Sequence, residues 1–334
     1  MDAKPGNHEV SGIAGGSCAT MRALRFHRYG EWSDVLTLEA LPIPMPGPGQ
    51  LRVRVDACAL NPMDWVLCQG FMPGPLPRGI GLDVSGTVDA LGEGVTDARV
   101  GDRVFGVPDF MAGASAGLAE FAVLAVWERV PDGLGMHEAA ALPMAVETAA
   151  RSLDLLGVEA GQTLFVNGGG TMVGFAAVQM GLLRGARVIT SAGDTFAARL
   201  RELGAQVTPY GPGMVERVRA IAGGAPECVL HAALVPGVLP DLVAIVDGEA
   251  RRVMSISDFD EAGLGVRTTG REPDLVPRYD VLKHYAQLAA AGRFTIPIAR
   301  TFGMDGWRTA LELCRSGRAH GKLLVLPHGA ERAP

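Results

Sequence analysis

One segment, residues 163–203, constrains the fold of this chain more than any other. It begins with a short apolar run at residues 164–166, which has the strand signature, and continues through Asn167 into a glycine-rich turn. An apolar, helix-prone segment then covers residues 175–183, and a second apolar run follows at residues 186–190. A strand, a glycine-rich turn, a helix and a second strand within this length predict one βαβ unit.

The glycine-rich turn of this unit has the properties of a phosphate-binding loop. Glycines let the backbone turn tightly and approach a ligand closely, and the start of the next helix offers unpaired N–H groups and a positive dipole end, which suit a pyrophosphate. We therefore predict a dinucleotide-binding loop made of Gly168, Gly169, Gly170, Thr171, Met172, Val173 and Gly174. The fingerprint G-x-G-x-x-G is incomplete, because Thr171 stands where its middle glycine belongs if Gly169 and Gly174 take the outer positions. The alternative is a glycine-rich turn without a ligand.

The size and charge of the chain narrow the class of protein. With 334 residues, of which 48% are hydrophobic and 20% charged, the chain can bury a large core and is long enough for two domains. Its net charge of −6 argues against a nucleic-acid-binding surface. The strongest candidate for a membrane span, residues 139–156, is interrupted by Pro143, Glu147, Arg151 and Asp154. We expect neither nucleic acid nor a membrane among its partners.

The cysteines and the N-terminal sequence bear on the compartment. The five cysteines form no C-x-x-C pair, and an odd, sparse set is typical of the reducing cytoplasm rather than of a disulfide framework. Residues 1–20 are rich in Gly, Ser and Ala and have neither the basic start nor the apolar core of a secretory signal. We therefore predict a cytoplasmic protein with a disordered leader at residues 1–20.

Strand patterns dominate the first third of the chain, whereas strands alternate with helices after His137. Early strands, separated by glycine and proline turns, are predicted at residues 21–26, 51–56, 84–91, 103–107 and 118–127. Beyond His137 the alternation of helix-forming and strand-forming stretches favours a parallel, doubly wound sheet. The predicted fold class is thus α/β, with a Rossmann doubly wound parallel sheet and a separate β-rich domain.

Six blocks of sequence occur in a specific order: ACALNPMDW (57–65), GLDVSGTVDALGEGVTDARVGDRVFG (81–106), AALP (140–143), VNGGGTMVGFAAVQ (166–179), ELGAQV (202–207) and GRAHGKLLVL (317–326). Together they resemble the zinc-independent, quinone-oxidoreductase-like branch of the medium-chain dehydrogenase/reductases. The resemblance implies a GroES-like catalytic domain built from both ends of the chain, residues 21–143 and 276–330. Residues 144–275 would form a Rossmann NADP(H)-binding domain, with a substrate cleft between the two.

The same resemblance implies an assembly and the absence of a metal. A homodimer would form through an edge strand of the Rossmann sheet, such as residues 252–257. Zinc-dependent relatives carry a cysteine ligand near Asn61 and a G-H-E motif near residues 81–83, and both are replaced here. A catalytic zinc needs three side-chain ligands. The spacing of Cys58, Cys68 and His27 supports no such set, so we predict no metal.

The end of the second strand of the βαβ unit bears on the choice between NADPH and NADH. An acid there would bind the ribose 2′-OH and repel a 2′-phosphate. The chain has Ser191 instead, and its first acid is Asp194. Similar reductases often carry a lysine where Phe196 stands and a tyrosine matching Tyr210; here the tyrosine is kept and the lysine is lost. We predict NADPH, contacted by Ser191 and Tyr210. A replacement cation could come from Arg199 or Arg201, which are otherwise solvated surface charges.

The predicted helix start at Asn61 carries the candidate chemistry. Without a metal, hydride delivery to the conjugated C=C–C=O of a quinone or enone remains, and it needs a donor to the carbonyl oxygen and a proton source. Asn61 can donate to a carbonyl or cap the helix, Asp64 can relay a proton or stabilise the first turn, and Trp65 can stack on substrate or fill the core. Relatives often carry a tyrosine beside this motif, and its absence leaves the proton donor open. Lys322 matches a basic position near the cofactor, or is a polar turn residue before a strand.

Three other functions stay open. A free-standing enoyl reductase of a biosynthetic, polyketide-like pathway would apply the same chemistry to a larger intermediate. An NADPH-binding sensor or scaffold with little turnover would fit the missing tyrosine and the altered glycine loop. A serine hydrolase is suggested by G-x-S-x-G at residues 113–117, but that motif needs a strand before the serine and a helix after it, whereas here a loop precedes and a strand-like run follows.

Overall fold

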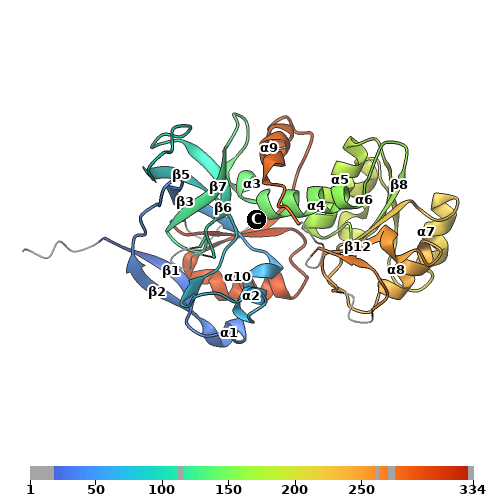
Figure 1. Ribbon diagram of the computed structural model, residues 1–334, viewed down its shortest axis with the longest axis horizontal. Coiled ribbons are helices and arrows are strands. Elements are labelled where there is room, and N and C mark those ends of the chain that lie inside the picture. The colour runs from blue at the N-terminus through green and yellow to red at the C-terminus, as the bar shows by residue number, and fades with distance from the viewer. Residues whose placement is uncertain (1–18, 112–115, 260–262, 270–274, 330–334) are drawn as a thin grey trace, which may run out of the picture.

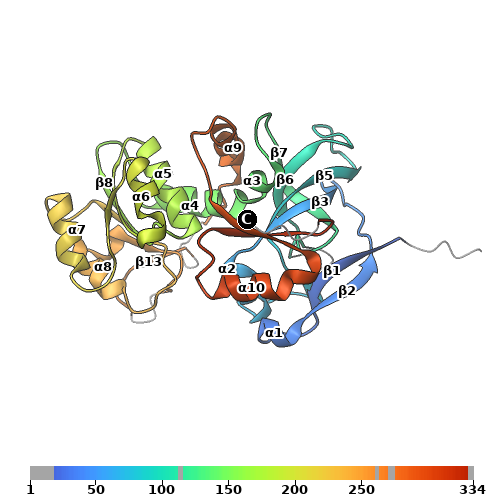
Figure 2. The same cartoon turned by 180° about the vertical axis from the view of Figure 1, so that it is seen from behind.

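Two lobes lie side by side in the computed structural model, which describes residues 19–111, 116–259, 263–269 and 275–329 (Figure 1). The first and last parts of the chain, blue and red, build one lobe, and the middle of the chain builds the other. The reverse view shows the same division (Figure 2). The predicted leader at residues 1–20 and the G-x-S-x-G motif at residues 113–117 fall largely outside the described residues.

Two β-sheets form the first lobe. The smaller has the order β2-β1-β4, from Leu36–Pro42, Thr20–Phe26 and Arg78–Gly79. The larger has the order β14-β15-β3-β5-β6-β7, from Ile298–Gly303, Lys322–Leu326, Leu51–Ala59, Asp83–Leu91, Arg103–Pro108 and Phe121–Arg129. Because β3 also pairs with β7, strands β3, β5, β6 and β7 close on themselves. The helices of this lobe are α1, α2 and α10, at Trp32–Val35, Pro62–Cys68 and Trp307–Arg315. Since β14 and β15 come from the C-terminal part, both ends of the chain build this lobe, as predicted.

A six-stranded parallel sheet forms the second lobe. Its order is β10-β9-β8-β11-β12-β13, from Gln206–Thr208, Arg187–Ser191, Thr163–Asn167, Cys228–His231, Val253–Ser255 and Arg267–Thr268. Helices α4 to α8 pack around it, at Pro143–Leu155, Met172–Leu183, Asp194–Glu202, Met214–Ala222 and Leu239–Ile245. This is the doubly wound nucleotide-binding order, and it confirms the predicted fold class.

Shorter elements connect the lobes and complete the described chain. The helices are α3 and α9, at Met136–Ala140 and Leu282–Ala290, and three 3₁₀ helices lie at Ala250–Arg252, Tyr279–Val281 and Met304–Gly306. No described helix is both long and apolar enough to pass through a bilayer.

Burial explains why the two kinds of strand have different sequence patterns. In β3, Leu51, Val53 and Val55 are buried while Arg54 is exposed, as expected for a strand with one face on a core. In β8, Leu164 and Val166 pack with α4 and α5, whereas Phe165 packs with α7 and α8. Covered faces on both sides require an unbroken apolar run in a parallel strand.

One structural expectation was wrong and one remains open. Residues 252–257 are not an edge strand, because Met254 and Ser255 of β12 pair with Arg267 and Thr268 of β13 on the side away from β11. A two-residue strand too short to leave a sequence signal therefore covers that edge. The domain boundaries at residues 143/144 and 275/276 stay predictions.

Candidate active site and cofactor loop

The turn after β8 needs its glycines for steric reasons. Gly168 has φ +95°, and a Cβ there would lie 2.6 Å from the Ala233 nitrogen. A Cβ on Gly169 would lie 2.1 Å from Thr190 Oγ1. Contacts below 3 Å cannot be tolerated at backbone or buried atoms, so these two positions exclude any side chain.

Thr171, in the place of the middle glycine of the fingerprint, begins helix α5. Its Oγ1 accepts a hydrogen bond from Gly174 N at 3.0 Å and donates one to Gly168 O at 2.9 Å. Gly174 is needed because its Cβ would lie 2.1 Å from Gly168 O. The threonine therefore closes the turn and caps the helix with one hydroxyl, which is why the incomplete fingerprint still folds as the predicted loop.

Three main-chain N–H groups of the loop remain available to a ligand. Gly168 N donates to Ser191 Oγ, Gly169 N to Ser191 O, and Thr171 N to Gly168 O. The N–H groups of Gly170, Met172 and Val173 have no acceptor among the described residues. Met172 and Val173 are the first residues of the 12-residue helix α5, whose positive dipole end favours an anion, and Gly170 precedes its N-cap, Thr171. The loop thus fits the pyrophosphate of a dinucleotide.

Ser191 supports the loop from the end of β9. Its Oγ accepts a hydrogen bond from Gly168 N at 3.0 Å and donates one to Asn167 Oδ1 at 2.6 Å. The second bond orients the Asn167 amide so that its Nδ2 donates to His231 Nδ1 at 3.0 Å. His231, which no sequence pattern marks, must accept this hydrogen bond and is neutral. Its burial lowers the pKa of its imidazole to about 4. The predicted Ser191 contact with the cofactor stays a prediction, while its contact with the loop is direct.

Gly193 and Tyr210 lie just after the carboxyl ends of β9 and β10. The ring of Tyr210 is 67% exposed, and its hydroxyl lies 3.6 Å from the place of a Cβ on Gly193, the residue before α6. Phe196, in the place of the expected lysine, packs on Phe175 with ring centroids 5.7 Å apart and approaches Gly170. An exposed phenol, rather than a cation, is therefore the group that borders Gly193.

A buried polar cluster lies in the first lobe. Lys322 Nζ is 2.5 Å from Asn61 Oδ1 and 3.0 Å from Asp83 Oδ2, and it also donates to Leu60 O at 3.4 Å. Asn61 Nδ2 donates to Asp83 Oδ2 at 2.9 Å and to Ala59 O at 3.3 Å. The ammonium and the carboxylate fix the orientation of the Asn61 amide. The longer bond to Ala59 O is the one that a substrate carbonyl could replace.

Asp83 also connects this cluster to the second lobe. Its Oδ1 accepts a hydrogen bond from Met144 N, in the first turn of α4, at 2.8 Å. Helix α4 in turn packs on α5, the helix of the glycine loop. The Asp83 carboxylate therefore accepts hydrogen bonds from Lys322, from Asn61 and from the N-terminus of α4. These three partners explain how a fully buried acid is accommodated. The sequence analysis did not select Asp83, although an acid directly before the apolar run at residues 84–91 is a signal that could have found it.

Asp64 and Trp65 have structural contacts that favour the alternatives of the sequence analysis. The Asp64 carboxylate accepts Asn61 N at 2.7 Å and Gly81 N at 2.8 Å. Burial raises its pKa to about 7, although those two donors and Lys322 act in the opposite direction. Trp65 lies in the hydrophobic core of the first lobe. The roles of these residues in chemistry stay predictions, as does a cofactor contact by Lys322, whose ammonium is buried in the cluster.

Tyr279, which the sequence analysis did not select, offers a phenol near the cluster. Arg278 N donates to Glu147 Oε1 at 3.2 Å, which fixes the segment against α4 one turn beyond Met144. Burial raises the pKa of the Tyr279 phenol to about 12, and the carboxylates of Glu147 and Asp83 add to the shift. Its hydroxyl makes no hydrogen bond to a described residue, so it remains a free, protonated donor.

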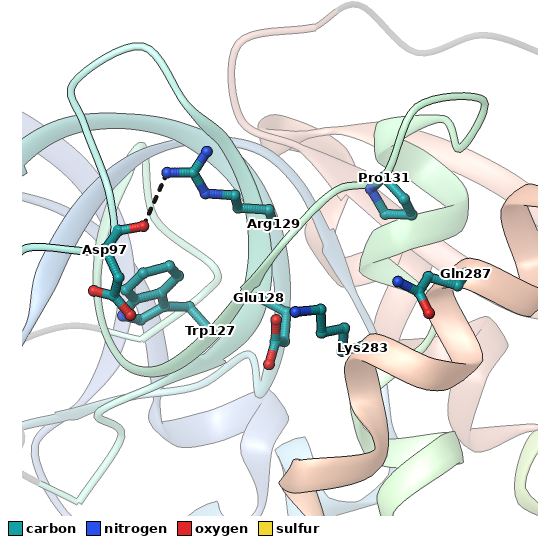
Figure 3. A pocket seen from close by; sticks show the side chains of 7 residues that line it. All are labelled: Asp97, Trp127, Glu128, Arg129, Pro131, Lys283 and Gln287. Carbon is teal, nitrogen blue, oxygen red and sulfur yellow. Dashed lines mark hydrogen bonds between the residues drawn. The ribbon is translucent and has the colours of Figure 1, made fainter.

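The described residues contain no metal site, and one cavity in them lies away from the cluster and the glycine loop. Across the described ranges, no group of three or more His, Cys, Asp or Glu side chains could bind a metal ion. A cavity of about 290 Å³ lies between β7 and α9 (Figure 3). Its lining contains none of the residues above and consists of Asp97, Trp127, Glu128, Arg129, Pro131, Lys283 and Gln287.

Comparison with known proteins agrees with this geometry. A family model described as "Alcohol dehydrogenase GroES-like domain" matches residues 47–142, and one described as "Zinc-binding dehydrogenase" matches residues 227–325. A chloroplast envelope quinone oxidoreductase homolog of Arabidopsis thaliana is 32% identical over 228 residues, which cover 64% of this chain and 68% of that protein. The chain belongs to the quinone-oxidoreductase-like medium-chain dehydrogenase/reductases. Members of this family are oxidoreductases that bind a nicotinamide cofactor.

Two further matches agree with this family. The quinone oxidoreductase of Sus scrofa is 35% identical over 179 residues, about half of each chain (52% and 53%). The solved quinone oxidoreductase of Coxiella burnetii has a TM-score of 0.70 at 25% identity, and the match covers 92% of this chain and 99% of that one. The predicted family is therefore confirmed, and the architecture extends over nearly the whole chain.

Proposed function

We propose that this oxidoreductase uses NADPH to reduce a quinone or the C=C bond of an α,β-unsaturated carbonyl, without a metal ion. The observation that carries the proposal is the buried Lys322–Asp83–Asn61 cluster. It supplies a fixed cation and an oriented amide beside the first turn of α4, where zinc-dependent relatives are expected to carry metal ligands. Together with the glycine loop, it provides a cofactor site and a place for a carbonyl on adjoining elements.

The choice of NADPH is supported by the end of β9. Ser191 and Gly193 place no carboxylate where a ribose 2′-phosphate would lie, and Tyr210 borders that position with an exposed ring. A mycobacterial protein of the same fold was solved in complex with NADPH (TM-score 0.77, 24% identity). The N–H groups of Gly170, Met172 and Val173 would bind the pyrophosphate.

The reaction assigns a role to each group of the site. When bound, NADPH supplies a hydride, which adds to the β-carbon of the acceptor and leaves negative charge on its carbonyl oxygen. The Asn61 amide donates to that oxygen in place of its bond to Ala59 O, and Lys322 stabilises the charge electrostatically. Tyr279 delivers the proton to the α-carbon, and because the residue is only partly buried, water can restore that proton. Asp64 is less suited, since both of its oxygens are already bound to main-chain donors.

The test measures NADPH oxidation over a panel of quinones and enones, with Tyr279→Phe beside the natural protein. We expect turnover with several acceptors, and for Tyr279→Phe about a 100-fold lower kcat with an unchanged dissociation constant for NADPH. Tyr285→Phe is the matched control, because it removes the hydroxyl of another tyrosine, whose ring lies in α9 and packs on Phe294. No turnover across the panel, despite tight NADPH binding, would favour a sensor or scaffold.

A second candidate is a free-standing enoyl reductase of a biosynthetic pathway. The enoyl reductase component of the lovastatin nonaketide synthase of Aspergillus terreus is 37% identical over 130 residues, 35% of that protein. Preference for a thioester-bound enoyl chain over free quinones in the same assay would favour it. Cytoplasmic location and homodimer formation remain predictions.

A further inference from the structure

Two aromatic rings from the two lobes meet. Phe71, in the segment after α2, and Phe259, in the segment after β12, have ring centroids 5.3 Å apart and planes tilted by 32°. Phe71 is 44% exposed, although its ring packs on that of Phe259. We call this pair the aromatic bridge. An exposed aromatic contact between lobes contributes little to a core, so it calls for another explanation.

Both rings are attached to elements that build the candidate site. Phe71 N donates to Val66 O in α2, the helix that begins after Asn61. On the other side, Asp258 N donates to Ser255 Oγ at the carboxyl end of β12, and Ser257 Oγ donates to Ala233 O in the loop after β11. Ligands of doubly wound sheets bind at this carboxyl edge. The bridge therefore lies where the substrate cleft would open.

Apolar side chains continue the surface beside Phe71. Met72 and Met111 are both more than one-third exposed. The fully buried Arg78 joins their segments, because its guanidinium donates to Met72 O at 2.5 Å and contacts Met111 Sδ at 3.4 Å. Methionines adapt to varied apolar shapes, and aromatic rings stack on flat ones. This rim is thus built to receive an apolar, planar group.

The dimensions limit what could bind. A flat ring placed between two others needs about 3.5 Å on each side, so opening the bridge by about 2 Å from 5.3 Å would admit one. Helix α2 has seven residues and is about 10 Å long. A ring at the bridge would therefore belong to a substrate that extends about 10 Å from a carbonyl at Asn61.

We propose that Phe71 and Phe259 form a substrate subsite that stacks against a flat ring at the far end of an aryl system conjugated with the reacting C=C–C=O. The proposal rests on the reductase function above and narrows its substrate class to planar aryl-substituted acceptors. Small enones would react without using the bridge. The two rings determine specificity, while the reacting atoms lie at Asn61 and the cofactor.

The experiment compares three enones that differ only in the substituent at C4: pent-3-en-2-one, 4-(4-cyclohexylphenyl)but-3-en-2-one and 4-(biphenyl-4-yl)but-3-en-2-one. In the last two compounds the outer ring reaches the bridge from a carbonyl at Asn61, and only the biphenyl compound has a flat outer ring. Steady-state kcat/KM with NADPH is measured for the natural protein and for Phe71→Ala, Phe71→Leu and Phe259→Ala. Met45→Ala, which removes an apolar side chain that is 77% exposed elsewhere in the first lobe, is the control.

We expect the natural protein to prefer the biphenyl enone over the cyclohexylphenyl enone by about tenfold or more, through KM. Each Phe variant, including the apolar Phe71→Leu, would lose most of that preference and keep its rate with pent-3-en-2-one. A natural protein that turns over all three enones without preferring the biphenyl compound would overturn the subsite but leave the reductase function standing. Variants that lose activity equally with every enone would also overturn it. No turnover with any acceptor would instead refute the reductase function, and the subsite with it.

Discussion

Lys322 and Asp83 form an ion pair that is almost completely excluded from solvent, with Nζ 3.0 Å from Oδ2 and the two side chains 3% and 0% exposed. They come from β15 and β5, which are not adjacent in the sheet, and Asn61 lies between them in the hydrogen-bond network. The pair therefore depends on the C-terminal strands returning to the first lobe.

Replacement of Lys322 by methionine should destabilise the fold strongly. The Asp83 carboxylate would stay buried without its cation, a situation that costs about 3–5 kcal/mol. A double-mutant cycle tests this: the free energy of unfolding is measured with denaturant for the natural protein, Lys322→Met, Asp83→Asn and the double variant. We expect the double variant to recover at least half of the loss, since the uncompensated charge is gone. Additive losses would show that the two residues do not act as a pair.

Gly170→Ala separates cofactor binding from folding. A Cβ at Gly170 meets only the edge of the Phe196 ring at 3.3 Å, whereas one at Gly169 would lie 2.1 Å from Thr190 Oγ1. We expect Gly170→Ala to unfold at nearly the natural denaturant concentration but to bind NADPH about tenfold more weakly, equivalent to ~1.4 kcal/mol. Gly169→Ala should lose both stability to denaturant and affinity for NADPH. Unchanged NADPH affinity in Gly170→Ala, measured by calorimetry, would place the pyrophosphate elsewhere.

Gly193→Asp should shift the cofactor preference from NADPH toward NADH. The position precedes α6, where aspartate is a favoured cap, and its Cβ would make only an ordinary 3.6 Å contact with Tyr210. The new carboxylate would repel a 2′-phosphate and bind a ribose 2′-OH. We expect the ratio of NADPH to NADH affinity to fall by at least tenfold, equivalent to ~1.4 kcal/mol. Gly193→Asn is the uncharged control and should keep the natural preference; equal shifts in both variants would speak against a 2′-phosphate here.

Asp64 should make stability depend on pH. Burial raises its pKa from 3.8 to about 7 in the folded chain, so between these values the folded state retains a proton that the unfolded state has released. Its contribution is therefore fully present below pH 4 and is lost as pH rises through about 7. His231, with its pKa lowered from 6.5 to about 4, acts in the opposite direction, because stability is lost as pH falls through that window.

The comparison that isolates Asp64 is Asp64→Asn against the natural protein, by denaturant unfolding at pH 5, 6 and 8. We expect the difference in unfolding free energy to change in favour of the variant as pH rises. The exposed Asp305→Asn serves as control. A difference that is constant over this range would mean that Asp64 is ionised throughout.

The sequence was informative where local rules determine structure. The alternation in β3, the helix start at Asn61 and each element of the βαβ unit follow from patterns that are local in sequence, and the structure has each of them. The glycine loop could be placed for the same reason, because a Cβ at Gly168 or Gly174 would clash with neighbouring backbone atoms.

The parts that sequence reasoning missed depend on contacts across long separations. Lys322 lies more than 200 positions from both Asn61 and Asp83, so its pairing follows only from the sheet order. The position of Tyr279 near Asp83 depends on how the chain returns along α4, and no local pattern marks it. Strand β13 has two residues, too few for a period to appear.

The most direct test follows a labelled hydride through a protein whose metal content is known. The chain is dialysed against a chelator, its zinc is quantified, and it is mixed with 4-phenylbut-3-en-2-one and NADPH deuterated at the transferable position of the nicotinamide. We predict one deuterium at the β-carbon of the product, at the same rate before and after chelation. A product without deuterium, or a rate that disappears on chelation and returns only with stoichiometric zinc, would contradict the account.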